Sequence, residues 1–455
     1  MDKMIGNEPN VKILGANLYG TTICAAASRI STTNGSAISL FEKSIDNPNN
    51  EKLVKNVLLS GHQSIMEHCF FNIAFNNVSA FVEQYMIEFR LASFTVQSRR
   101  YVDFSNVGFF TDPHFSTDIA SRYDTHMKNL CDTYEKLLEL GIPKEDARFV
   151  LPYCFHSNFY CSCNARELLH IICTMLYGRG RGFEELLLIG NELALEFERY
   201  FPNELGKHKD KYSVEKEKTE KWAAALSDRK CDSLQSVVSN TQLLSHSTLS
   251  SSDIFESTVY NFAAPDDEAE NKYELLYNTR ARELELISLS FKIRDISLSA
   301  ITHLVRHRMQ SVLVPCVGNA IYKNRHIVPD SVSANEAAKN IYEEAFLNNV
   351  EVFHTLIENG MDPIHCVYFA LSGNTMDVIS SMNGREFAHF TQLRTCNRAQ
   401  WEIRKISEDM LKLSREIYPD IFSKLGPSCF INGKCPEGKK TCGHIAEVKE
   451  RFSKF

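Results

Sequence analysis

The sequence lacks the features that would assign it at once to several large classes of protein. No apolar run approaches the ~20 residues of a membrane-spanning helix, and the opening MDKMIGNEPN is not expected to be a secretory signal. No G-x-G-x-x-G follows a predicted strand, and there is no Walker loop. The net charge of −7 lacks the basic excess of a general nucleic-acid binder. We therefore expect a cytoplasmic protein without a membrane or nucleic-acid partner, and no Rossmann-type or P-loop nucleotide site.

Cysteines are numerous but show no disulfide framework. The chain has 455 residues, of which 14 are cysteines, and without a secretion signal these are expected to be reduced thiols. The tail contains Cys429, Cys435, Cys442 and His444. Their spacing lacks the paired C-x-x-C of structural zinc sites, so we predict no metal site, although a metal-binding tail stays open as an alternative.

The chain contains one pattern twice. Glu67 and Glu285 are 218 residues apart (285 − 67), and Ser79 and Ser297 share this offset. Further along, an offset of 219 relates four residues of the first copy to four of the second: Asn164, Arg166, Glu167 and His170 to Asn383, Arg385, Glu386 and His389. A constant register with one insertion indicates a duplication. We predict two homologous repeats that form a pseudo-dimer, at 1–205 and 233–425, with a charged, partly helical connector at 206–232 and a cysteine-containing tail at 426–455.

Each repeat is predicted to mix helices and strands. Residues 70–78 and 288–296 alternate apolar and polar side chains, as strands do. Ser79 and Ser297 follow these strands as helix N-caps. Further helices are expected at about 115–140 and 338–359, from Asn164 and Asn383 onward, and at 399–417. The fold class is therefore α+β.

A basic triplet follows an apolar segment in ITHLVRHRMQS, residues 301–311. On a helix, Arg306 and Arg308 would point about 200° apart, so they cannot serve one small patch on one helix face. They can line a site at the helix end. The alternative is a solvated positive helix terminus, which the helix dipole favours.

The charged positions are distributed between the repeats in a complementary way. The second repeat has basic residues where the first has none: Arg306, His307 and Arg394 against Glu88, Phe89 and Met175. The first repeat has Ser98, Arg100 and Arg148 against Cys316, Gly318 and Val367. We interpret this as one composite site that draws on both repeats, whose counterpart has been abandoned. The alternative is independent loss in two diverging copies. Converging arginines suit a phosphate, and a His beside Arg can stabilise negative charge on a carbonyl or a reduced flavin.

These motifs together resemble the flavin-dependent thymidylate synthases. The stretches that carry the resemblance cover most of both repeats: GHQSIMEH (61–68), FRLASFTVQSRRY (89–101), DARFVLP (146–152), NAREL (164–168), LVRHRMQS (304–311) and NGREFAHFTQLRTCNRAQWEIR (383–404). The tail GPSCFINGKCPEGKKTCG is similar to tails of some members. The resemblance implies FAD as cofactor and NADPH and methylenetetrahydrofolate as co-substrates. It also implies reductive methylation of dUMP to dTMP without an enzyme thiol as nucleophile, and homotetramers, here replaced by a dimer of pseudo-dimers.

The resemblance also assigns roles to residues. Arg394 matches the arginine that polarises the uracil and is the catalytic candidate. The remaining substrate-binding positions are Ser98, Arg100, Arg148, His303 and Arg306. The flavin positions are His62, Ser64, Arg306, His307, Arg308, Asn383, Arg385 and His389. The first-repeat set Asn164, Arg166 and His170 is also present, so the sequence leaves open which set holds the flavin.

Two departures from the family pattern widen the choice of substrate. His303 stands where the family has Gln three residues before Arg-His-Arg, and Val96 replaces a polar residue two before Ser98. One alternative is therefore a flavin- and folate-dependent methylase of another pyrimidine nucleotide. A second is a non-catalytic nucleotide-binding pseudoenzyme. The sequence does not decide the oligomeric state or whether the degenerate site has a role of its own.

Overall fold

The polypeptide passes three times between two compact units. A computed structural model of the chain describes residues 9–105, 107–257 and 281–454. The first unit consists of Met1–Cys231 with Asn340–Ala370, and the second of Asp232–Lys339 with Leu371–Phe455. The segment Asn340–Ala370, which belongs by sequence to the second repeat, is therefore part of the first unit.

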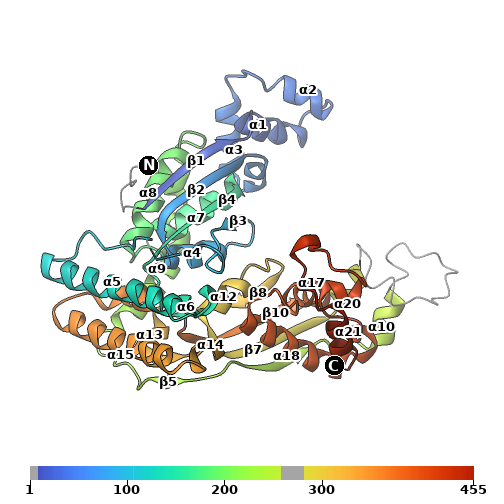
Figure 1. Cartoon of the computed structure of the whole chain (residues 1–455). Helices are drawn as coiled ribbons and strands as arrows, with labels where there is room; N and C mark the ends of the chain where they lie inside the picture. Colours follow the sequence, from blue (N-terminus) through green and yellow to red (C-terminus); the bar gives the residue numbers. More distant parts are fainter. Residues whose placement is uncertain (1–8, 106, 258–280, 455) are drawn as a thin grey trace. The chain divides into compact units, whose positions relative to one another are not determined.

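The first unit contains a four-stranded antiparallel sheet in the order β1-β2-β4-β3 (Figure 1). Its strands are β1 (Asn10–Ala16), β2 (Phe70–Ser79), β3 (Ser93–Val96) and β4 (His156–Asn164). The second unit contains a sheet of the same order, β6-β7-β10-β8, built from β6 (Asn240–His246), β7 (Ser288–Ser297), β8 (Gln310–Leu313) and β10 (Thr375–Asn383). A two-stranded parallel pair joins β5 (Gln235–Ser236) to β9 (Arg325–His326).

The two sheets share an irregularity at the same place. The pairing of β2 with β4 shifts between Phe75 and Val78, and that of β7 with β10 shifts at the corresponding point. Asn77 and Asp295, 218 residues apart, both adopt the left-handed backbone conformation, with φ of 52° and 51°. Asn and Asp tolerate this conformation better than other side chains. Together with the repeated strand order, the shared bulge confirms two homologous halves of α+β class.

The predicted helix starts are confirmed in both repeats. The Ser79 hydroxyl accepts a hydrogen bond from the Val82 amide at the start of α4 (Ala80–Ile87), and Ser297 does the same for Ala300 in α12 (Leu298–Leu304). Asn164 caps α7 (Ala165–Leu176), and Asn383 caps α17 (Gly384–Arg394). Each cap satisfies an amide that the helix leaves unpaired. These caps set where α7 and α17 begin, and therefore which side chains stand at their ends.

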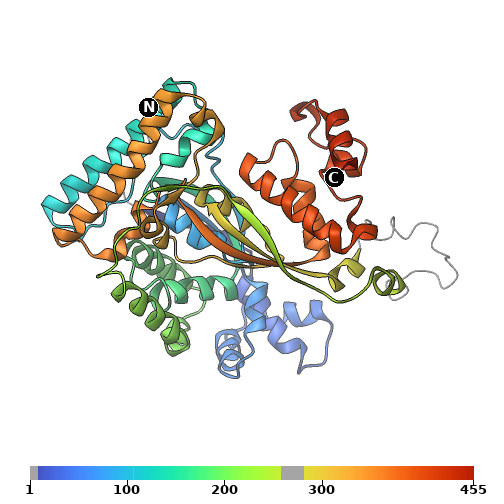
Figure 2. The ribbon, with the colours of Figure 1, turned by 90° about the horizontal axis from the view of Figure 1, so that it is seen from below.

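Two long helices lie side by side in the first unit (Figures 1 and 2). They are α5 (Thr117–Glu139) and the part of α15 (Glu336–Glu358) that belongs to this unit. His126 of α5 lies 2.9 Å from the Asn349 side chain of α15, and both side chains are buried. The Phe369 ring packs against Tyr123, His126 and Phe353. A helix of the second repeat thus forms part of the core of the first unit.

The remaining helices cover the sheets or connect the repeats. They include α1 (Gly20–Ile30), α2 (Ala37–Glu42), α3 (Asn50–Leu59), α8 (Glu184–Phe197), α9 (Ser213–Ala224), α10 (Ser251–Glu256), α13 (Asn319–Lys323), α14 (Asp330–Ser333), α18 (Trp401–Ile417), α20 (Ser428–Ile431) and α21 (Ile445–Ser453). Shorter turns of 3₁₀ helix include η1 (Gln63–His68), η3 (Leu205–Tyr212) and η6 (Pro363–His365). Helix α9 buries no residue fully, whereas Tyr212 and Leu226 on either side of it are buried. Among the described helices, none is long and apolar enough to cross a membrane.

Candidate functional site

The basic triplet and the end of α17 meet in one cavity of the second unit. The cavity has a volume of about 670 Å³. It is lined by Glu285, Arg306, His307, Arg308, Met309, Asn383, Arg385, Glu386, His389, Leu393 and Arg394. The triplet lies in the turn between α12 and β8, just past the helix end. Arg385, His389 and Leu393 are four residues apart on α17, so they lie on one face. We call this cavity the basic pocket.

His307 is the buried centre of the basic pocket. Its Nδ1 lies 3.0 Å from a carboxylate oxygen of Glu386, and its Nε2 accepts a hydrogen bond of 2.9 Å from Arg394 Nε. The His389 and Phe390 rings pack against it. Since a guanidinium only donates, Nε2 must be unprotonated, and Nδ1 carries the proton that faces Glu386. Burial lowers the pKa of His307, the Glu386 hydrogen bond raises it, and the Arg394 charge lowers it, with a net downward shift that agrees with a neutral ring.

The basic pocket has an excess of positive charge. Its two carboxylates are already engaged, Glu386 with His307 and Glu285 with Arg385, whose Nη1 lies 2.7 Å from Glu285 Oε1. The side chains of Arg306 and Arg308 are exposed at the cavity. A pocket of this size and charge fits an anionic ligand with phosphate groups, which guanidinium groups bind well.

A second group of arginines lies in the first unit. Arg148 is buried, and its Nε donates to the Glu145 carbonyl at 3.0 Å, whereas its Nη2 has no hydrogen-bond partner among the described residues. Burial, followed by the charge of Arg99, lowers the pKa of Arg148 to about 10. The Arg100 amide donates to the Ser98 hydroxyl, and Arg100 Nε lies 2.5 Å from Glu145. Clustered guanidinium groups with an unused buried donor are suited to an oxyanion.

The other predicted site residues lie elsewhere. His62 and Ser64 are exposed in and beside η1 of the first unit. His303 is buried on α12 and does not line the basic pocket. In contrast, seven of the predicted site residues line the basic pocket: Arg306, His307, Arg308, Asn383, Arg385, His389 and Arg394.

The corresponding place in the first repeat is filled by its own side chains. Glu88 pairs with Arg179 at 3.0 Å, and the Arg179 guanidinium stacks on the Tyr85 ring, 4.5 Å from its centroid. The Phe89 ring contacts His170 edge-on, and His170 Nδ1 lies 2.8 Å from the Tyr212 hydroxyl of the connector. Met175 is fully buried. These residues leave no cluster of cationic side chains like that of the basic pocket.

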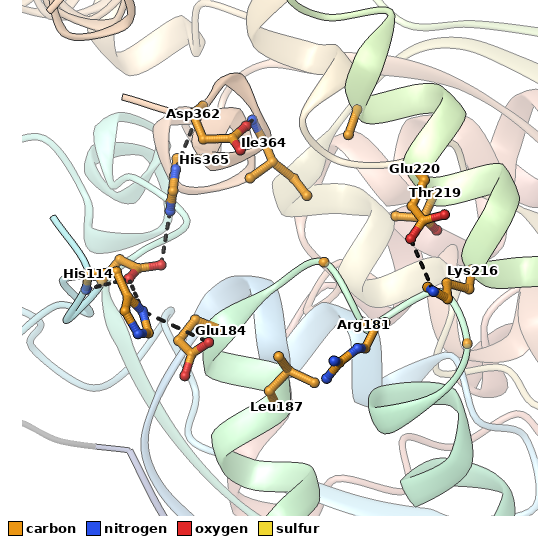
Figure 3. Close-up of a pocket in the computed structure, with 14 residues that line it drawn as sticks. His114, Arg181, Glu184, Leu187, Lys216, Thr219, Glu220, Asp362, Ile364 and His365 are labelled. Carbon is orange, nitrogen blue, oxygen red and sulfur yellow. Dashed lines mark hydrogen bonds and ion pairs between the residues drawn. The ribbon is translucent and has the colours of Figure 1, made fainter. Parts of the chain in front are cut away.

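A different pocket, of about 480 Å³, lies nearby in the first unit (Figure 3). Three chain segments line it, besides the loop of Asp112 and His114: Gly178–Leu187, the connector helix α9, and Asp362–His365 of the second repeat. His365 Nε2 lies 2.9 Å from Asp112, and its Nδ1 lies 2.9 Å from the Asp362 carbonyl. By the offset of 219, residues 362–365 correspond to 143–146, which precede Arg148. We call this the mirror pocket.

Sequence reasoning missed several of these groups. Glu386, Arg99, Glu145 and Arg179 were not assigned to any site. For Glu386 a signal was present, because Glu167 stands at the same place in the first repeat. For Arg179 the sequence contains no comparable signal, because its contacts with Tyr85 and Glu88 arise only from packing in the folded chain.

The cysteines lie as free thiols. Within the described residues, no three His, Cys, Asp or Glu side chains are arranged to hold a metal ion. Burial, together with the neighbouring Cys396, Cys435 and Cys442, raises the pKa of Cys429. The tail cysteines therefore lie close to Cys396, which follows Arg394 by two residues. His444 does not join them and contacts Glu447.

Comparison with known proteins gives a consistent set of similarities. A family described as thymidylate synthase complementing protein matches the chain twice, at residues 14–203 and 228–420. A flavin-dependent thymidylate synthase of Geobacter sulfurreducens is 37% identical over 172 residues, which is 37% of this chain and 74% of the relative. That of Clostridium tetani is 30% identical over 186 residues, again 37% of this chain and 74% of the relative.

Two solved structures also match. The UMP/dUMP methylase PolB from Streptomyces cacaoi, bound with 5-Br dUMP, is 23% identical, with a TM-score of 0.35, over 43% of this chain and 92% of that one. Thymidylate synthase X of Helicobacter pylori, with FAD and dUMP, is 19% identical, with a TM-score of 0.34, over 45% of this chain and 98% of that one.

Proposed function

Because the chain belongs to the thymidylate synthase complementing protein family, whose pattern it contains twice, we propose that it converts dUMP to dTMP as a flavin-dependent thymidylate synthase. One observation carries this proposal. The second repeat keeps the full set Arg306, His307, Arg308 and Arg394 around one cavity, and the first repeat keeps Arg100 and Arg148. Neither repeat keeps both sets, so we propose that they complete one composite site.

The first repeat supplies the phosphate contacts. Ser98, Arg100 and Arg148 bind the nucleotide phosphate, for which Arg148 Nη2 is an available buried donor. Binding of a dianion here offsets the cost of keeping Arg148 charged beside Arg99. Val367 at the corresponding position of the second repeat offers no donor at all.

The second repeat supplies the groups that act on the base. Arg394 donates to a uracil carbonyl and stabilises the negative charge that develops on the pyrimidine. Arg306 contacts both nucleotide and flavin. No cysteine is needed as a nucleophile, in agreement with the raised pKa that burial gives the Cys24, Cys131 and Cys173 thiols.

The basic pocket fits the anionic part of FAD by its charge. We propose that FAD is held by His307, Arg308, Asn383, Arg385 and His389, with Arg306 and with His62 and Ser64 of the first repeat. When bound and reduced by NADPH, FAD would supply the hydride that reduces the one-carbon unit to a methyl group after its transfer from methylenetetrahydrofolate to the pyrimidine. The first-repeat set is disfavoured because the connector's Tyr212 contacts His170 there.

A visible spectrum of the purified full chain tests the function. We expect a flavin band that bleaches on anaerobic addition of NADPH, faster with dUMP, and dTMP formation once methylenetetrahydrofolate is added. A protein that takes up no FAD, or one that binds nucleotide and flavin without forming product, would favour the pseudoenzyme alternative.

The substrate could be a different pyrimidine nucleotide, as the departures at Val96 and His303 suggest. Assays with dUMP, UMP and dCMP, alone and in competition, distinguish these substrates. The true acceptor forms methylated product and inhibits methylation of a competing nucleotide with a Ki close to its own KM. We also propose a cytoplasmic dimer of double chains, which light scattering on the purified protein would test.

A further inference from the structure

The basic pocket contains a continuous chain of contacts between three side chains that the proposed function does not yet explain. It runs from Glu386 through His307 to Arg394, with contacts of 3.0 Å and 2.9 Å on opposite sides of the imidazole. We propose that Glu386 and His307 are positioning residues that hold the Arg394 guanidinium toward the nucleotide base, through an imidazole kept neutral with its proton on Nδ1. This inference rests on the proposed function for the identity of the base.

The direction of each hydrogen bond fixes the protonation state of the ring. Arg394 Nε can only donate, so His307 Nε2 must present a lone pair. The Glu386 carboxylate then accepts from Nδ1. If the ring were protonated on both nitrogens, an N–H would face the guanidinium and the bond to Arg394 would be lost. His307 therefore supports Arg394 only in its neutral form.

The position of Arg394 in the cavity lining agrees with a contact to a bound ligand. The contact to His307 uses Nε, whereas the two Nη atoms lie further along the side chain, which lines the cavity. An arginine side chain has several rotatable bonds and loses much rotamer freedom when it is fixed. An acceptor bound at Nε reduces that freedom before the nucleotide arrives, which lowers the entropy lost in reaching the reactive geometry.

A second observation comes from the other repeat. Glu167 stands where Glu386 does, and Asn164 caps its helix in the same way, with an Asn–amide bond of 2.9 Å. In that repeat His307 is replaced by Phe89 and Arg394 by Met175. The imidazole and the guanidinium have thus been lost together, while the carboxylate has been kept. Joint loss is expected if the histidine serves the arginine.

The environment of His307 contains few other groups that could set its protonation. Glu386 and Arg394 contact it directly, His389 lies with its ring centroid 5.7 Å away, and Phe390 covers one side at 4.9 Å. Burial lowers its pKa, Glu386 opposes this, and Arg394 and His389 add to the lowering. Removing Arg394 should therefore raise the pKa of His307, and neutralising Glu386 should lower it further.

The test compares His307→Gln, whose amide oxygen can still accept from Arg394, with His307→Phe, which reproduces Phe89 and cannot accept. Both are assayed in the full chain with saturating FAD and NADPH and with flavin content measured. We expect His307→Phe to lose kcat on the order of 10²-fold with little change in the KM for dUMP, and His307→Gln to keep most of it. The wild type should lose activity on the acid side through protonation of His307, and His307→Gln should not. Phe89→His is the matched control and should lower stability but leave the turnover of the folded protein unchanged, since Met175 offers no guanidinium there.

Equal losses in the Gln and Phe variants, or a full recovery of the Phe variant with excess FAD, would overturn the positioning role. A direct titration keeps the inference testable apart from turnover. In the NMR spectrum of the full chain, with His307 assigned through His307→Gln, we expect Arg394→Gln to raise the titration midpoint of His307. An unchanged midpoint overturns the contact even if the enzyme is active. A wild type that makes no dTMP but shows the expected shift would refute the proposed function and leave the arrangement of the three side chains standing.

Discussion

The ends of α7 and α17 show how one helix can serve a site in one repeat and close it in the other. Both helices begin at an asparagine cap, both have a glutamate three residues after the cap, and both place an arginine on an outer carboxylate, Arg166 on Glu67 and Arg385 on Glu285. They differ at the last turn, where α7 has the buried Met175 and α17 has Arg394. The two repeats therefore share the start of this helix and differ at its end.

The first repeat shows what stands in place of the cationic side chains of the second. Removing the cationic side chains would leave a void, which is costly in a packed interior. Here Arg179 stacks on Tyr85 and neutralises Glu88, and the connector brings Tyr212 against His170. These contacts make the corresponding place in the first repeat part of the packed interior of its unit.

The largest effect on turnover is expected at the end of α17 and not at the end of α7. Arg394→Ala should lower kcat/KM for dUMP by roughly 10²–10³-fold, as for the loss of a preorganised donor to a developing negative charge. Met175→Leu, a volume-conserving change at the corresponding position, should leave turnover within error. Steady-state kinetics on both variants makes the comparison, and near wild-type turnover by Arg394→Ala would refute its assigned role.

The next largest effect is expected on dUMP affinity and compares Arg148 with Val367, the residue at the same position of the second repeat. Arg148→Ala should weaken dUMP binding by roughly 10- to 100-fold, because a charge-assisted hydrogen bond contributes about 1.5–3 kcal/mol. Val367→Ala removes only buried methyl groups and should lower Tm without changing dUMP affinity. Calorimetric titration with dUMP distinguishes them, and equal losses of affinity would contradict the composite site.

The smallest effect on catalysis is expected in the mirror pocket. Burial raises the pKa of Asp112, but hydrogen bonds from His365 and His114 outweigh it and hold the pKa below its ordinary value. Such a carboxylate adds stability above the pKa of the unfolded chain and loses it as pH falls through the folded value. Asp112→Asn should therefore cost about 1.5–3 kcal/mol of unfolding free energy at neutral pH, and the difference should shrink below about pH 4.

Urea denaturation at several pH values measures this change, with the exposed Asp330→Asn as control. Turnover of both variants should match the wild type. If Asp112→Asn slowed dTMP formation, the mirror pocket would have a part in the reaction after all, and the two pockets would no longer contrast.

Repetition made much of the molecule predictable. The strands at 70–78 and 288–296, their serine caps and the helices that begin at Asn164 and Asn383 follow from local pattern, and the structure confirms them. Part of the basic pocket was predictable because Arg306, His307 and Arg394 differ from the residues at the same positions of the other repeat. A single unduplicated copy would have offered no such comparison.

Other features could not be predicted because they depend on packing over long distances. Nothing local to residues 340–370 shows that they join the first unit, since an amphipathic helix records which face is apolar but not which core receives it. The His307–Arg394 contact depends on two rotamers 87 residues apart in sequence. The approach of Cys396 to the tail cysteines likewise arises only in the folded chain.

The placement of Asn340–Ala370 in the first unit has a consequence for the history of the gene. A duplication can ordinarily be undone by deleting one copy, because each copy still encodes a complete subunit. Here the first copy alone would lack the partner of His126 and the Phe369 ring that packs on Tyr123. Deletion of the second copy would therefore remove part of the core of the first unit. The first copy thus depends on the second for its own stability, and that dependence acts against loss of the second copy.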